Sequence, residues 1–185
     1  MGASLPGSPS VFGLLQVNIE EARKILKRHS HGPQVLEALR FRLALQLADP
    51  KKDPMMNQVW DAYKVLPSMI KTPCSILDAG CMSGFLYHYL KKRINDFTYT
   101  GVDRWEEALQ VGREYAPELD FRRGDLETDY FGQFDYVICS NIPWQAGNKQ
   151  AAFENLLMQA KTLIFIHPLN VVEKFERATG NTPDA

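Results

Sequence analysis

The sequence predicts an α/β fold with an open, mostly parallel, doubly wound sheet and an N-terminal helical extension. Three observations predict it: short apolar runs alternate with amphipathic stretches from Thr72 onward, the run ILDAG ends in an acid and a glycine, and residues 18–70 show helical periodicity. Strands that alternate with helices at this spacing are joined by crossover helices and are therefore parallel.

The N-terminal part of the chain reads as a flexible start followed by helices. Residues 1–9 are mostly small residues, glycine and proline, which is typical of a mobile terminus. The segment after Asn18 has a helix cap, early acids and late bases, and residues 34–49 place leucines at helical spacing. These leucines are Leu36, Leu39, Leu43 and Leu47, and Arg40 and Arg42 lie off their stripe. Asp53 before Pro54 predicts the start of a third helix that ends before Pro67.

These patterns divide the chain into three parts. We expect a flexible terminus or an added edge strand at 1–17, a helical lid or extension at 18–71, and an α/β domain at 72–185.

Composition excludes several classes of protein. The 185 residues carry a formal charge of −1, which argues against a basic footprint over the whole protein but leaves room for a local patch. Cys74, Cys81 and Cys139 have no C-x-x-C spacing, so we expect free thiols in a reducing compartment. The sequence shows no leader pattern and no long apolar run. It therefore predicts a soluble cytoplasmic protein with no membrane partner.

The stretch ILDAGCMSGFL at 76–86 is the first candidate site. Ligands of open α/β sheets lie at the carboxyl ends of the strands, and the glycines at 80 and 84 permit a tight turn there. The spacing does not fit the G-x-G-x-x-G fingerprint, which disfavours NAD. An acid at the strand end favours a ligand with positive charge, such as an ammonium or a sulfonium, and S-adenosylmethionine carries both.

Across roughly Cys74 to Pro168 the chain resembles the class I S-adenosylmethionine-dependent methyltransferases. LDAGCMSG is similar to the D-x-G-x-G-x-G loop of that family, with Met82 at the position of the usual middle glycine. The resemblance implies S-adenosyl-L-methionine as cofactor. The loop residues that it assigns to cofactor binding are Asp78, Gly80, Cys81, Met82 and Gly84.

Two further segments carry the same resemblance. Asp103 ends the strand YTGVD, where the family has an acid that accepts hydrogen bonds from both ribose hydroxyls, and Arg104 and Trp105 follow it. FRRGDLE implies that Asp125 accepts from the adenine amine and that Leu126 lines the adenine pocket. Each piece also has a structural explanation, because a strand-terminal aspartate is often a helix cap and a tryptophan is often half-buried surface.

The fourth strand leads into the acceptor side. Asn141-Ile142-Pro143-Trp144 resembles the N-P-P-Y and N-I-P-Y motifs of methyltransferases that act on planar amino groups. The resemblance implies that Asn141 accepts from the amino group and that Trp144 stacks on it, with Asn141 also next to the cofactor. A turn made by Asn141 and Pro143, with a core tryptophan, explains the same letters equally well.

His167 ends the fifth strand on the expected crevice side. It is either a base for the acceptor or a strand-end cap that bonds locally. No spacing of histidines and cysteines predicts a metal site.

The C-terminal segment after 168 reads as helical and then polar, so the last two of the family's usual seven strands are expected to be missing from a shortened C-terminus. The bare edge of the fifth strand would then need cover, from a homodimer partner or from residues 10–17.

The functional expectation is a methyltransferase with an unidentified acceptor, either a small molecule, a protein or a nucleic acid. Two alternatives remain open: a catalytically silent binding module of the same fold, and another adenosyl-cofactor transferase such as an aminopropyl transferase.

Overall fold

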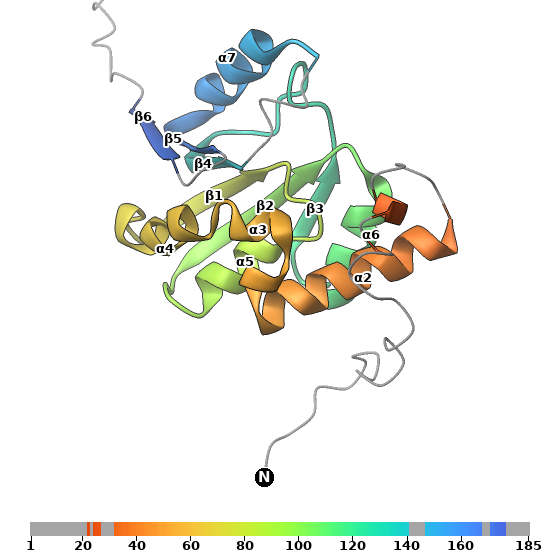
Figure 1. Ribbon diagram of the computed structural model, residues 1–185. Helices are drawn as coiled ribbons and strands as arrows, with labels where there is room; N and C mark the ends of the chain where they lie inside the picture. The colour runs from red at the N-terminus through yellow and green to blue at the C-terminus, as the bar shows by residue number, and fades with distance from the viewer. Residues whose placement is uncertain (1–21, 23, 27–31, 141–146, 168–170, 177–185) are drawn as a thin grey trace, which may run out of the picture.

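The computed structural model describes residues 22, 24–26, 32–140, 147–167 and 171–176. Its centre is a six-stranded sheet with the order β3-β2-β1-β4-β5-β6 (Figure 1). Strands β1 to β5 are parallel, and β6 is antiparallel to β5. The strands are β1 (Cys74–Ala79), β2 (Phe97–Asp103), β3 (Asp120–Arg123), β4 (Phe134–Ser140), β5 (Ala160–His167) and β6 (Val171–Glu176). The predicted α/β fold with a mostly parallel sheet is confirmed.

Helices cover both faces of the sheet. On one side lies α7 (Lys149–Gln159), and on the other lie α5 (Phe85–Lys91), α6 (Glu106–Tyr115) and the N-terminal helices (Figure 1). Successive side chains of a strand point to opposite faces. Ile76 and Ile138 therefore pack in the core under α5 and α6, while Leu77 and Val137 pack in the core under α7. This alternation puts an apolar core on each face and leaves the strand ends free for a site.

Within residues 32–73, four helical elements precede the sheet: α2 (Pro33–Ala48), η2 (Pro50–Lys52), α3 (Pro54–Asn57) and α4 (Trp60–Met69). The carboxylate of Asp53 caps α3 by accepting from the backbone amides that follow, as predicted. The prediction of one helix ending before Pro67 is wrong, because the chain breaks after Asn57 and Pro67 lies in the last turn of α4. Aromatic contacts to α5 hold α4 in place despite that proline, with Trp60 and Tyr89 centroids 5.4 Å apart.

Helix α2 buries a slightly different stripe from the predicted one. Leu39 and Leu43 are fully buried, but Leu36 and Leu47 are only partly so. The stripe also includes Val35, Ala38 and Gln46. On the neighbouring side, Arg40 makes two 2.7 Å contacts with Glu114 of α6, which fixes α2 across the α5 and α6 layer. Of the predicted helix after Asn18, residues 22 and 24–26 are described, and they are helical.

The segment after the fifth strand differs from the sequence prediction of a helix. Residues 171–176 form strand β6 along the edge of β5 and not a helix. Phe175 packs on Phe153 and Phe165, at centroid distances of 5.2 and 6.1 Å, and Val172 packs on the opposite face. Pairing with an open edge and partial burial of both side chains outweigh the helical appearance of VVEKFE, since strand formation depends on such context. The edge of β5 is therefore covered within the chain, while residues 10–17 lie outside the described part.

Among the described helices, none has the length and apolar character needed to cross a membrane.

Candidate functional site

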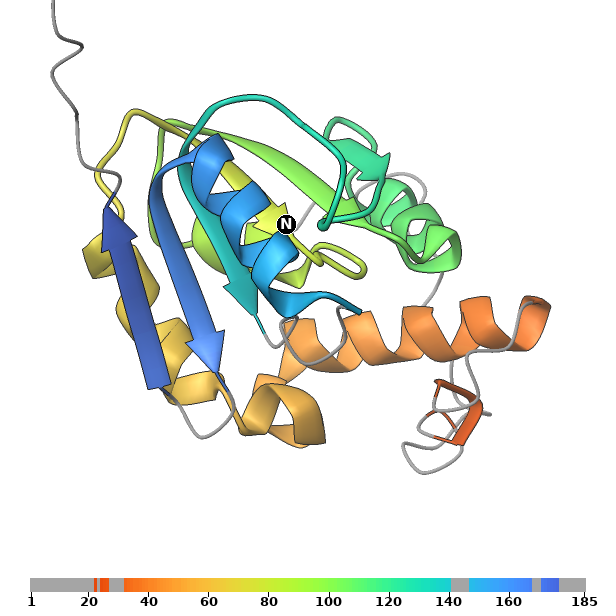
Figure 2. The ribbon, with the colours of Figure 1, turned by 90° about the horizontal axis from the view of Figure 1, so that it is seen from above.

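A cavity of about 640 Å³ opens at the carboxyl ends of β1, β2 and β4. The arrowheads of β4 and β5 point toward α2 and α3, which lie across this edge of the sheet (Figure 2). The strand order reverses between β1 and β4, and such switch points are where open α/β sheets bind ligands. The sheet edge forms the floor of the cavity, and helices α2 and α3 form its roof.

The glycine loop after β1 makes the turn that the sequence predicts. The amides of Gly80 and Cys81 both donate to the carbonyl of Val102, at 2.7 and 3.0 Å, which ties the loop to the end of β2. Gly80 and Gly84 have φ of 77°, and Met82 between them has φ of 51°. A non-glycine residue in this region costs about 1–2 kcal/mol, so the backbone at Met82 keeps the conformation that favours a glycine there.

Gly84 has a packing reason to be glycine. A Cβ on Gly84 would lie 2.7 Å from Cζ of Phe121, and the same ring would meet a Cβ on Gly101 or Gly112 at 2.9 and 2.8 Å. Gly84 is also absent from the residues that line the cavity. A glycine is thus required here by the Phe121 ring behind the loop and by the positive φ.

Asp78 lies under the loop at the end of β1. Its carboxylate accepts a 2.7 Å hydrogen bond from the hydroxyl of Tyr99. Burial raises the pKa of Asp78 to about 7, against the opposing effect of the Tyr99 hydrogen bond, and the negative charge of Asp103 raises it further. The carboxyl group therefore changes charge close to neutral pH.

Asp103 joins the loop to the start of α6. One oxygen of its carboxylate accepts from the amide of Met82 and the other from the amide of Trp105, both at 2.9 Å. Each carboxylate oxygen retains acceptor capacity beyond these bonds. Burial raises the pKa of Asp103, and the two amide bonds oppose this rise. Arg104 is exposed, and it lines the cavity beside them together with Trp105.

The segment after β3 closes one side of the cavity. Leu126 is buried there, whereas Asp125 is exposed and accepts from the amide of Glu127 at 2.9 Å. The side chain of Asn155 on α7 donates to the carbonyls of Leu126 and Asp129, at 3.0 and 2.8 Å. These bonds hold the segment against the far face of the sheet.

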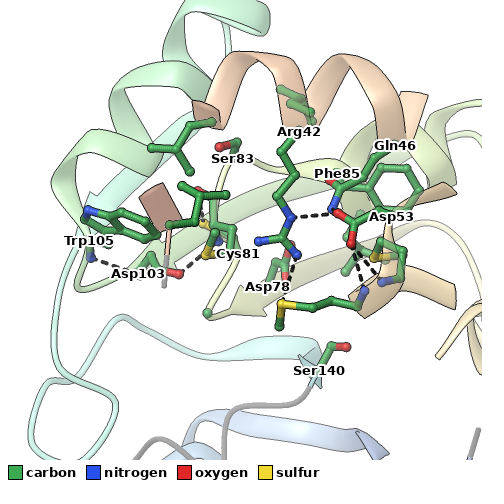
Figure 3. Close-up of a pocket in the computed structure, with 18 of the residues that line it drawn as sticks. Arg42, Gln46, Asp53, Asp78, Cys81, Ser83, Phe85, Asp103, Trp105 and Ser140 are labelled. Carbon is green, nitrogen blue, oxygen red and sulfur yellow. Dashed lines mark hydrogen bonds and ion pairs between the residues drawn. The ribbon is translucent and has the colours of Figure 1, made fainter. Parts of the chain in front are cut away.

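The roof of the cavity carries a polar cluster that the sequence analysis did not identify. Asp53, only 3% exposed, accepts from Nε of Arg42 at 2.7 Å and from Nε2 of Gln46 at 2.6 Å (Figure 3). Burial alone would raise the pKa of Asp53, but the charge and hydrogen bond of Arg42, together with the hydrogen bonds from Met55 and Gln46, lower it. The roof therefore holds a stable ion pair next to the titratable floor.

Two neighbouring hydroxyl groups line the cavity. Tyr63 of α4 lies beside Ser140, the last residue of β4, and burial raises the pKa of the phenol. Phe85 packs against Tyr63 with their centroids 5.9 Å apart. The sequence analysis did not identify Ser140.

The residues expected on the acceptor side are placed as follows. Asn141, Pro143 and Trp144 lie outside the described residues, directly after Ser140. His167 does not line the cavity: Nε2 lies 3.3 Å from a carboxylate oxygen of Glu173 on β6, without hydrogen-bond geometry among the described residues. This corrects the expectation that His167 faces the crevice, because its position on β5 puts it on the same face as Phe165 and α7.

Metal ligands are not grouped anywhere in the described part of the chain: no three of its His, Cys, Asp and Glu side chains are placed to hold an ion. The three cysteines are buried and free, as predicted.

The fold and the cavity define an α/β protein of the class I methyltransferase type. Residues 76–162 match a family model described as a methyltransferase domain. The matched part is slightly less than half of the 185 residues and includes the glycine loop after β1.

Known proteins with similar sequence or structure agree with this assignment. A curated relative, "Putative methyltransferase 235L" of Invertebrate iridescent virus 6, is 26% identical over 98 residues, which are 50% of this chain and 36% of the relative. The chain thus spans about a third of that relative's length. A TehB-like SAM-dependent methyltransferase from Corynebacterium glutamicum has a TM-score of 0.55 at 19% identity, covering 80% of this chain and 73% of its own. A SAM-dependent methyltransferase from Aquifex aeolicus has a TM-score of 0.54 at 22% identity, covering 74% and 78%. The two structural likenesses show the fold.

Proposed function

We propose that this protein binds S-adenosylmethionine in the cavity and transfers its methyl group to an acceptor. One observation carries the proposal: nine of the eleven residues that the sequence resemblance assigns to cofactor binding line a single cavity at the switch point. They come from three separate segments, the loop after β1, the end of β2 and the turn after β3. Such convergence of distant segments is hard to explain by local turn geometry alone.

The chain's own residues supply positioning. The Asp103 carboxylate is fixed by two amide bonds and keeps lone pairs for a diol, while Trp105 and Leu126 offer apolar surface for a base. When bound, S-adenosylmethionine supplies an electrophilic methyl group on a sulfonium. Because methyl transfer is an in-line displacement, alignment and exclusion of water are the main tasks of the protein, and no strong base is required.

The acceptor side is proposed to begin at Ser140. The segment Asn141-Ile142-Pro143-Trp144 continues from there, and its resemblance to motifs for planar amino groups supports an amino acceptor. Helices α2 and α3 across the strand ends support a lid role for the extension 18–71, with 72–185 as the cofactor domain.

Titration calorimetry with S-adenosylmethionine and S-adenosylhomocysteine tests the proposal. We expect micromolar binding by the wild type and at least a tenfold loss in Asp103→Ala, because the fixed diol acceptor is removed. Asp120→Ala is the matched control, since this aspartate lies on neighbouring β3, is exposed and pairs with Arg122 outside the cavity.

Lack of binding by folded wild type would overturn the proposal. Binding without transfer of radiolabelled methyl to any acceptor in small-molecule, protein and nucleic acid fractions would favour the silent binding module instead.

A further inference from the structure

Arg42 is positioned over the cavity by a buried cluster in the roof. Besides the bonds from Arg42 and Gln46, the Asp53 carboxylate accepts from the amides of Met55 and Met56, at 2.8 and 3.3 Å. Four donors on a carboxylate that is 3% exposed leave it little freedom to move. The Arg42 side chain is 18% exposed, and its guanidinium is held in one orientation by a partner that is itself fixed from α2 and α3.

The guanidinium group keeps unused donors on the cavity side. An arginine has five N–H donors. On Arg42, Nε is used by Asp53 and one Nη2 donor by the sulfur of Met55, at 3.4 Å, which leaves three donors without a partner among the described residues. Figure 3 shows the group inside the cavity, above Asp78 and between Asp53 and Cys81. The remaining donors are both of those on Nη1 and one on Nη2, and such a set can bond the two oxygens of a carboxylate.

The charges around the cavity restrict the ligand further. The lining acids among the described residues are Asp53, Asp78, Asp103, Asp125 and Glu127, and the cations are Arg42 and the exposed Arg104. One guanidinium already paired with Asp53 offers too little positive charge for a dianionic phosphate among so many acids. A monoanionic, planar carboxylate fits both the charge and the fork geometry.

We propose that Arg42 is a carboxylate-binding residue of this cavity. The inference rests on the proposed function for the identity of the larger ligand, and the carboxylate has two chemical sources. It belongs either to the amino acid end of the cofactor or to an acidic methyl acceptor.

The first arm of the test changes the ligand, so it needs no variant. Calorimetry compares S-adenosylhomocysteine with its decarboxylated analogue, which keeps the adenosine, thioether and amine. If the cofactor is the source, the wild type binds the analogue at least tenfold more weakly, and Arg42→Gln reduces this ratio to near one. Arg42→Lys keeps a charge beside Asp53 if the glutamine variant does not fold, and it should also lower the ratio because lysine lacks the fork.

The matched control is Arg40→Gln. Arg40 lies on the same helix two residues earlier, but it pairs with Glu114 on α6 and does not line the cavity. This variant should keep the wild-type ratio.

The second arm tests the acceptor as source. Benzoate and benzamide are added to the homocysteine-loaded protein, and binding is followed by saturation-transfer NMR. Contact with benzoate but not benzamide, lost in Arg42→Gln or Arg42→Lys and kept in Arg40→Gln, supports an acidic acceptor. A ratio near one in the first arm together with no preference for benzoate overturns the inference.

The two proposals fail separately. If the wild type binds neither adenosine ligand, the proposed function falls, and the benzoate comparison on the unliganded protein still decides whether Arg42 binds carboxylates.

Discussion

Asp53 in the roof and Asp78 in the floor of the cavity are equally buried, at 3% and 4% exposure, yet they differ in charge state. The pKa of Asp53 is lowered, whereas the pKa of Asp78 is raised to about 7. Asp53 accepts from four N–H donors, one of them on a cation, while Asp78 accepts from one neutral hydroxyl and lies near the negative Asp103. Burial sets the penalty for both, and the partners decide whether it is overcome.

The difference divides the cavity into two kinds of surface. The roof carries a permanent ion pair with spare donors, and the floor carries an acid that is ionised only above neutral pH. A ligand with both signs of charge would therefore bind the floor more strongly as pH rises through 7, because the ionised carboxylate attracts its cationic part.

The largest expected effect comes from Asp78→Asn. Below about pH 4 the carboxyl is protonated in both states; as pH rises to 7, only the unfolded chain ionises, and the wild type loses stability. A gap from 3.8 to about 7 corresponds to about 4 kcal/mol. The asparagine variant does not lose this stability. The difference in free energy of unfolding, variant minus wild type, should therefore increase by about 4 kcal/mol between pH 4 and pH 8. Urea denaturation at both pH values measures it, and a pH-independent difference would contradict it.

Asp53→Ala should destabilise the protein by about 3 kcal/mol at neutral pH. The change leaves the charge of Arg42 unpaired and removes the cap of α3. Asp61→Ala on α4 is the control, because that exposed aspartate pairs with Lys64 at the surface, and little change is expected. Equal midpoints for the two variants in chemical denaturation would show that the roof pair is not structural.

Tyr99→Phe sharpens the contrast at the floor. It removes the hydroxyl donor of Asp78, which favours the ionised form, so the pKa of Asp78 should rise further. We expect a cost of about 1.5 kcal/mol above pH 8, where the carboxylate is charged, and less at pH 5. Carbon-13 NMR titration of the labelled carboxyl reads the pKa directly; an unchanged value would show that the bond does not act on the charge.

Gln46→Leu is the corresponding change in the roof and should have the smallest effect. It removes one of four donors to Asp53, so the pKa of Asp53 should rise but remain below its ordinary value. The expected cost is about 1 kcal/mol, seen in the same denaturation assay. A loss as large as that of Asp53→Ala would mean that the donors act as one cooperative unit.

The floor was predictable from the sequence, and the roof was not. Asp78 and Asp103 end apolar runs, and the carboxyl ends of parallel strands meet at one edge, so local pattern is enough to bring them together. Arg40 and Arg42 both lie off the apolar stripe of their helix, so the sequence does not distinguish them. Only tertiary packing places Arg42 in the cavity and Arg40 against Glu114. Gln46 could have indicated the roof cluster. It follows Leu39 and Leu43 as the next residue on the buried face of α2, and a buried polar side chain needs a hydrogen-bond partner.

The C-terminal strand shows a second limit of sequence pattern. VVEKFE is too short to separate a helix from a strand by periodicity, and its pairing is decided by β5, which lies several residues away in sequence. The glycine loop shows the opposite case, since its turn was correctly expected while the reason for Gly84 lay in a ring from β3.

The Phe121 ring sits among Gly84, Gly101 and Gly112, and this has a consequence for how the protein can vary. A larger residue at any of the three positions requires the aromatic side chain to become smaller, and it is opposed further by the positive φ at Gly84 and by the Cys81 sulfur, 2.9 Å from a Cβ at Gly101. The four positions should therefore change together in descendants of this chain. Divergence of the glycine loop after β1 is thus coupled to a residue on β3 that does not line the cavity.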